Sequence, residues 1–86
     1  MKLVWDESAW DDYLWWQAQD RKVLKRVNAL ITEITRHGNE GIGKPEALRY
    51  SFQGYWSRRI TGEHRLIYKM VEGEIRIAQC RYHYEQ

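Results

Sequence analysis

Cysteine and proline are almost missing from this 86-residue sequence, which contains one of each, Cys80 and Pro45. A single cysteine cannot form an internal disulfide, so the sequence is not one of the small secreted domains that disulfides hold together. No apolar run approaches the length of a membrane span. The first residues do not read as a signal peptide either, since Val4 and Trp5 lead directly into an acidic segment. We therefore expect a single cytoplasmic domain over residues 1–86 that has no membrane partner.

The net charge is also low, at +2, and is too small to identify a partner by itself. Its distribution is uneven: residues 1–43 hold 6 Lys/Arg against 7 Asp/Glu, whereas residues 44–86 hold 8 against 5. The positive half also contains most of the Arg and Tyr residues, which favours a polyanionic partner. Aromatic residues are abundant, with five Trp and six Tyr, enough to fill a small core and leave rings for contacts with a partner.

The hydrophobic pattern predicts an α+β fold. Residues 1–5 indicate a first strand, and a helix is expected to begin at Asp6 or Ser8. A second helix is predicted from Asp20 to Gly38, with a single apolar stripe. The stripe consists of Val23, Leu24, Val27, Leu30, Ile31 and Ile34. Residues 38–54 indicate loops, and three β-rich runs follow at 55–60, 63–71 and 74–84. Short turns between these runs require antiparallel pairing, so we expect two N-terminal helices on one face of a twisted antiparallel sheet.

The first helix is less regular than the second. A helical period places Trp10, Tyr13, Leu14 and Gln17 on one face, with Ala9 and Trp16 at its margin, and we expect this face to be the buried one. Trp15 then points to the opposite, polar side. An indole in that position favours contact with a partner protein.

Two other readings of the sequence are excluded. Residues 38–44 match the start of a phosphate-binding P-loop, but Pro45 stands where a Ser or Thr would hold magnesium, and the segment follows a helix rather than a strand. The histidines His37, His64 and His83 are dispersed and lack the spacing of metal ligands. We therefore expect no metal and no cofactor.

The remaining chemistry is that of RNA cleavage. Such a reaction needs a base for the 2′-hydroxyl, a cation for the phosphate and an acid for the departing 5′-oxygen, and Glu46, Arg65 and His83 suit these roles in that order. From residue types alone, each also has a plain structural explanation. Glu46 reads equally as a solvated loop charge, Arg65 as an ion-pair partner of Glu63 or Glu74, and His83 as a surface residue.

Several motifs narrow this choice. The sequence opens with MKLVW and AWDDYLWWQ, has GKPEAL in its middle, continues with YWSRRIT and EHRLIY, and closes with CRYHY. Together they resemble the YoeB family of bacterial toxins, within the wider RelE/ParE superfamily, from Met1 to Tyr84. The resemblance implies a fold of the microbial ribonuclease type, with helices on a twisted antiparallel sheet. It also implies a ribosome-dependent endoribonuclease that cleaves messenger RNA in the A site, without a metal.

The resemblance assigns roles to particular residues. It implies that Glu46 is the general base, that Arg65 stabilises the pentacovalent phosphate, that His83 is the general acid, and that Tyr84 orients the phosphate or nucleotide. The residues expected to help hold RNA are Lys44, Arg49, Arg58, Arg59 and Arg81.

The resemblance implies partners as well. It predicts inhibition by a YefM-type antitoxin, a homodimer, and association with DNA only through the antitoxin, with Trp15 a candidate for the antitoxin or dimer surface. Two alternatives stay open: a ParE-like toxin that binds its target without catalysis, and a ribonuclease that does not need the ribosome. The family pattern usually stops near Y-H-Y, whereas this sequence continues with Glu85 and Gln86.

Overall fold

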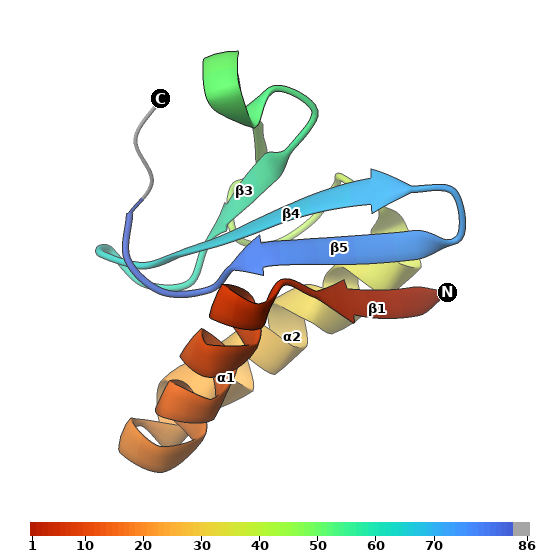
Figure 1. Cartoon of the computed structure of the whole chain (residues 1–86). Coiled ribbons are helices and arrows are strands. Elements are labelled where there is room, and N and C mark those ends of the chain that lie inside the picture. Colours follow the sequence, from red (N-terminus) through yellow and green to blue (C-terminus); the bar gives the residue numbers. More distant parts are fainter. Residues whose placement is uncertain (84–86) are drawn as a thin grey trace.

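A five-stranded sheet with two helices against one of its faces makes up the computed structural model, which describes residues 1–83 (Figure 1). The elements follow the chain in the order β1 (Lys2–Trp5), α1 (Glu7–Gln19), α2 (Arg21–His37), β2 (Glu46–Ala47), the 3-10 helix η1 (Tyr50–Phe52), β3 (Trp56–Arg59), β4 (Arg65–Val71) and β5 (Glu74–Gln79). Within these residues, neither helix is long and apolar enough to cross a membrane. The predicted fold class, two helices packed on a sheet in an α+β domain, is confirmed.

The sheet has the strand order β1-β5-β4-β3-β2. Consecutive strands from β2 to β5 pair antiparallel, as the short turns after β3 and β4 require. Strand β1 joins the far edge and pairs parallel with β5, so that Lys2 lies opposite Glu74. The sheet is therefore mixed, and not wholly antiparallel as predicted. The parallel pair joins the first and the last strand of the chain, and this long-range contact leaves no local signal in the sequence.

Helix α2 forms as its sequence predicts. The side chain of Asp20 caps its first turn by accepting hydrogen bonds from the backbone N–H groups of Lys22 and Val23, at 3.1 and 3.2 Å. Gly38 ends the helix with a φ of +64°. Its apolar stripe packs into a core that also receives side chains from β4 and β5. The buried residues of that core are Ala9, Trp16, Val27, Leu30, Ile31, Ile34, Ile60, Leu66, Tyr68, Ile75, Ile77 and Cys80.

The buried face of helix α1 is rotated from the centre of the predicted face toward its margin. Ala9 and Trp16 are buried, whereas Trp10 and Leu14 are exposed. The reason is tertiary: the inward face of α1 is set by its docking near the end of β5, where the Trp16 indole donates a hydrogen bond of 2.7 Å to the backbone oxygen of Cys80. Trp10 instead stacks on Tyr13, with ring centroids 5.6 Å apart.

The last strand is shorter than predicted. Strand β5 ends at Gln79 rather than at Tyr84, and residues 80–83 form a bend in which Tyr82 has a φ of +68°. We call this segment the 80–83 bend. Tyr84, predicted to orient the phosphate, lies outside the described residues. Leaving the strand frees the chain from strict alternation of side chains, which brings His83 back toward the sheet.

Candidate active site

The sheet has one face toward the helices and one away from them. Leu66 and Tyr68 of β4 belong to the core, so their neighbours Arg65 and Ile67 point to the opposite face. The register carries this face across the sheet, since Arg65 lies opposite Arg59. In the same way Ile67 lies opposite Ser57, and Ser57 lies opposite Glu46. Strand pairing alone therefore places a carboxylate, a hydroxyl and two guanidinium groups on the face that the helices leave uncovered.

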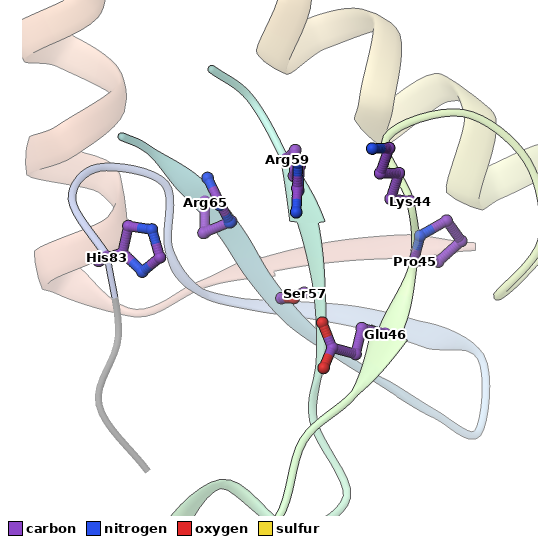
Figure 2. A pocket seen from close by; sticks show the side chains of 7 residues that line it. All are labelled: Lys44, Pro45, Glu46, Ser57, Arg59, Arg65 and His83. Carbon is purple, nitrogen blue, oxygen red and sulfur yellow. The ribbon is translucent and has the colours of Figure 1, made fainter. Parts of the chain in front are cut away.

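These side chains line a pocket of about 450 Å³. Its lining residues are Lys44, Pro45, Glu46, Ser57, Arg59, Arg65 and His83. Figure 2 shows His83 and Glu46 on opposite sides of the pocket, with Arg65 and Arg59 between them. Three fixed positive charges face one carboxylate, so the pocket favours an anion such as a phosphodiester. Five of the predicted site residues, drawn from four separate segments, thus come together.

Arg65 is the best-anchored of the cations. It is only 8% exposed, and its Nη1 donates hydrogen bonds to the backbone oxygens of Thr61, Gly62 and His64, at 2.8, 3.2 and 3.1 Å. Glu74, which the sequence offered with Glu63 as an ion-pair partner for Arg65, pairs with Arg76. The guanidinium is therefore held in one orientation at the pocket wall before any substrate binds, as electrostatic catalysis requires.

Glu46 reaches the pocket through a short glycine-containing connection from α2. The backbone oxygen of Gly43 accepts a hydrogen bond of 2.7 Å from the Arg59 N–H, which brings residues 43–46 alongside β3. Gly43 has a φ of +87°, and a Cβ at this position would lie 2.8 Å from Leu30 Cδ2. Only glycine accepts both the conformation and the close approach. The Glu46 carboxylate is exposed, as is the ammonium-bearing side chain of Lys44.

The 80–83 bend, which carries His83, is held mainly by side chains. Two side chains of α1 bind the backbone of Cys80. The Asp12 carboxylate accepts a hydrogen bond from its N–H at 3.1 Å, and the Trp16 indole donates one to its backbone oxygen. Tyr82 is bound by the loop before β4, because its N–H donates to His64 Nδ1 at 2.7 Å, while its backbone oxygen accepts from the Arg65 N–H at 3.1 Å.

Burial around this bend raises the pKa values of two side chains. Burial raises the pKa of the Asp12 carboxyl, and the hydrogen bond from Cys80 and the positive charge of Arg81 oppose that shift. Burial, together with the negative charge of Asp12, raises the pKa of the Cys80 thiol to about 12. Cys80 is therefore a protonated core residue at neutral pH. In residues 1–83 no group of three or more His, Cys, Asp and Glu side chains is placed to hold a metal ion.

Arg58, predicted to help hold RNA, lies outside the pocket lining. Arg58 is completely buried, because it alternates with Arg59 along β3 and so points toward the helices. Its guanidinium donates to the backbone oxygens of Gly38, Glu40 and Ile42 at 2.7, 2.9 and 2.8 Å. It also donates to the Tyr68 hydroxyl at 3.2 Å. Arg58 thus fixes the loop after α2.

Arg49 and Arg81 lie outside the pocket lining. Arg49 is exposed just before η1. The Arg81 guanidinium stacks on the Trp15 ring, 3.6 Å from its centroid, and on the Tyr82 ring at 4.5 Å. Trp15, predicted to face a partner, is thus partly covered within the chain, although it stays 38% exposed. RNA binding by Arg49 and Arg81 stays a prediction.

Sequence reasoning missed two lining residues, Ser57 and Pro45. Ser57 had a usable signal: it lies two residues before Arg59 in the same strand, and residues at that spacing share a face. The same rule would have excluded Arg58.

Comparisons with known proteins agree on one family. The model of the "YoeB-like toxin of bacterial type II toxin-antitoxin system" family matches residues 5–84. The chain is 52% identical to "Toxin YoeB" of Escherichia coli (strain K12) over 84 residues, which cover 98% of this chain and 100% of that relative. It is also similar to the solved "YoeB/ParE toxin from Agrobacterium tumefaciens", with a TM-score of 0.95 and 46% identity over 98% of this chain and 100% of that one.

Solved structures from Staphylococcus aureus extend the comparison. One is described as a heterotetrameric complex of the YoeB-YefM toxin-antitoxin and another as a YoeB dimer. Each is 45% identical to this chain and covers 98% of both chains, with TM-scores of 0.91 and 0.92.

Proposed function

This chain belongs to the YoeB-like toxins of bacterial type II toxin–antitoxin systems, and from that membership we propose that it is an endoribonuclease that cleaves messenger RNA in the ribosomal A site and so inhibits translation. The observation that carries the proposal is the pocket shared by Glu46, Arg65 and His83. A carboxylate, a guanidinium and an imidazole around one cavity are the groups that metal-independent cleavage of a phosphodiester needs.

In the proposed mechanism the carboxylate of Glu46 removes the proton from the RNA 2′-hydroxyl, whose oxygen then attacks the adjacent phosphorus. The Arg65 guanidinium donates hydrogen bonds to the phosphate oxygens as their negative charge increases. Protonated His83, across the pocket from Glu46, gives its proton to the departing 5′-oxygen (Figure 2). The products are a 5′-hydroxyl fragment and a fragment that ends in a 2′,3′-cyclic phosphate or a 3′-phosphate.

Two neighbouring cations support substrate binding. Lys44 and Arg59 line the same pocket and are exposed, so we propose that they hold phosphates on either side of the scissile bond. Tyr84, outside the described residues, is proposed to orient the phosphate or nucleotide. An aromatic ring is suited to this role because it stacks on an unpaired base.

The proposal includes protein partners. By similarity to the Staphylococcus aureus complex and dimer, we propose that this chain forms a homodimer and is inhibited by a YefM-type antitoxin. Its place of action is then the cytoplasm, where ribosomes and messenger are found, and contact with DNA occurs only through the antitoxin.

The test uses purified chain with a 5′-labelled messenger, either naked or bound to programmed ribosomes. We expect cleavage of the ribosome-bound messenger, with 5′-hydroxyl ends, and much slower cleavage of naked RNA. Glu46→Gln removes the proposed base without changing its size and is expected to abolish the cuts. Glu72→Gln, at an exposed turn residue outside the pocket, is the matched control.

Three results would contradict parts of the proposal. Equal cleavage of naked RNA would favour a ribosome-independent nuclease. Inhibition of growth without cleavage of either substrate would favour a toxin that only binds its target. Full activity of the Glu46→Gln variant would remove Glu46 from the reaction.

A further inference from the structure

His64 lies between the helices and the 80–83 bend but does not line the pocket. Its ring packs edge-on against the Trp16 ring, with centroids 4.7 Å apart. Its Nδ1 accepts the Tyr82 N–H at 2.7 Å, and its ring centroid lies 5.9 Å from that of Tyr82. Tyr82 immediately precedes His83, so His64 binds the backbone next to the proposed general acid.

This hydrogen bond depends on the charge of the imidazole. A ring nitrogen accepts a hydrogen bond only when it carries no proton, whereas both nitrogens of a protonated imidazole are donors. Protonation at Nδ1 would place an N–H against the N–H of Tyr82. The contact would then become repulsive at the point where it holds the bend.

The backbone of the bend has another anchor at the start of β4. The Arg65 N–H donates to the Tyr82 backbone oxygen at 3.1 Å, so Tyr82 is bound on both of its backbone polar groups by consecutive residues. Gln79 Nε2 lies 3.4 Å from the His83 backbone oxygen. Among these contacts, the one from His64 changes from attractive to repulsive when the imidazole is protonated.

We propose that neutral His64 is a positioning residue, which holds the 80–83 bend so that His83 faces the pocket, and that protonation of His64 releases the bend and lowers cleavage. This inference rests on the proposed function, because it concerns the placement of the proposed acid. His83 must carry a proton to react, whereas His64 must lack one. The reaction thus needs the two histidines in opposite protonation states.

Charged groups from several elements lie around His64. Asp12 of α1 interacts electrostatically with His64. Asp20 at the start of α2 and Glu63 line a cavity of about 350 Å³ together with His64. Two cations lie on the other side: Arg65, whose Nη1 donates to the His64 backbone oxygen, and Arg81, which stacks on the Tyr82 ring.

Two substitutions separate the hydrogen bond from the packing. His64→Asn keeps an acceptor, because its side-chain oxygen takes the place of Nδ1, but removes the ring and its titration. His64→Phe keeps the ring against Trp16 and removes the acceptor. Misplacing a catalytic group typically costs about 10- to 100-fold in rate, so we expect His64→Phe to lower kcat by about that factor with KM nearly unchanged. We expect His64→Asn to stay within about 3-fold of the wild type.

The pH profile tests the switch itself. Histidine side chains titrate between about pH 5 and 8, so kcat of the wild-type protein should fall toward pH 5, and this fall should be smaller in His64→Asn, which keeps only the requirement for an ionised Glu46. Amide hydrogen exchange of Tyr82 reports the same event without any RNA. Its protection should be lost in His64→Phe, lost in the wild type at low pH, and kept in His64→Asn at every pH.

The outcomes separate the two proposals. If the wild-type protein cleaves messenger but His64→Phe has an unchanged kcat and full protection of Tyr82, the role of His64 is overturned. If both variants fall equally and share the wild-type pH profile, His64 serves packing alone and the proposal is wrong. If the wild type cleaves no messenger, the proposed function falls, while Tyr82 exchange still decides whether His64 holds the bend. Should His64→Phe not fold, the profile of His64→Asn against the wild type decides.

Discussion

The two walls of the pocket are built in different ways. On one side, Glu46, Ser57, Arg59 and Arg65 belong to paired strands, and the backbone ladder of β2, β3 and β4 sets their spacing. On the other side, His83 belongs to a bend whose backbone is bound by side chains of Asp12, Trp16 and His64.

The two walls therefore differ in how easily their backbone can move. A strand ladder resists local change because several hydrogen bonds must break together, whereas a bend held by individual side chains can open when a single one is changed. We infer that substitutions behind the strand wall mainly affect folding, and that substitutions behind the bend mainly affect cleavage. The following predictions test this comparison.

The largest effect is expected from removing one reacting group of each wall. Glu46→Ala and His83→Ala should each lower messenger cleavage at least ~100-fold, the usual scale for a positioned base or acid. Single-turnover cleavage of ribosome-bound messenger measures both. His37→Ala, at an exposed residue that ends α2, is the control for His83 and should keep the wild-type rate. Rates near the wild type for either alanine variant would remove that residue from the mechanism.

Next in size is the effect of Arg58, which supports the strand wall from behind. Arg58→Met should lower the free energy of unfolding by about 2–3 kcal/mol, because buried backbone oxygens of the loop after α2 lose their donor. Arg59→Met, one residue later but exposed at the pocket, is the matched control and should change stability by less than about 0.5 kcal/mol while weakening RNA binding. Urea unfolding of both variants measures this. Equal stability losses would contradict the assignment of opposite sheet faces.

A smaller effect is expected behind the bend. Trp16→Phe leaves the Cys80 backbone oxygen without its indole donor, which should cost about 1–2 kcal/mol and lower kcat several-fold through displacement of His83. Trp15→Phe keeps a ring under Arg81 and serves as the comparison. Thermal unfolding and cleavage are measured on the same samples. A loss of stability with unchanged kcat would show that the bend keeps its position without this bond.

The smallest effect concerns the thiol of Cys80, the first residue of the bend. Because the pKa of Cys80 is raised to about 12, the folded protein keeps this proton at pH values where an unfolded thiol loses it. The unfolded state then binds fewer protons, so stability should fall as pH rises above about 8.5, by about 1 kcal/mol at pH 9.5. Unfolding of the wild type and Cys80→Ala from pH 7 to 9.5 measures the difference in slope. Identical slopes, or rapid thiol labelling of the folded protein, would contradict the burial.

Much of the candidate site could be predicted from the sequence. Residue chemistry and the motifs point to Glu46, Arg65 and His83 together with Lys44 and Arg59, and the structure brings all five to one pocket. Arg58, which the resemblance places among the RNA-binding residues, lies outside the pocket because side chains alternate along β3 and its neighbour Arg59 takes the pocket face. The spacing of the three histidines predicts no metal site, and nothing else in the sequence indicates a role for His64. Its contact with Tyr82 depends on a bend that follows no periodic pattern.

The sequence by itself determined the elements whose signal is local. The stripe of α2 repeats with the helical period, Asp20 and Gly38 mark its ends, and the short turns after β3 and β4 impose antiparallel neighbours. Tertiary structure alone decided which face of α1 is buried, that β1 pairs parallel with β5, and where β5 gives way to the bend. Each of these depends on contacts between residues that are distant in the chain, and the free energy of such contacts depends on the docked partner rather than on neighbours in sequence.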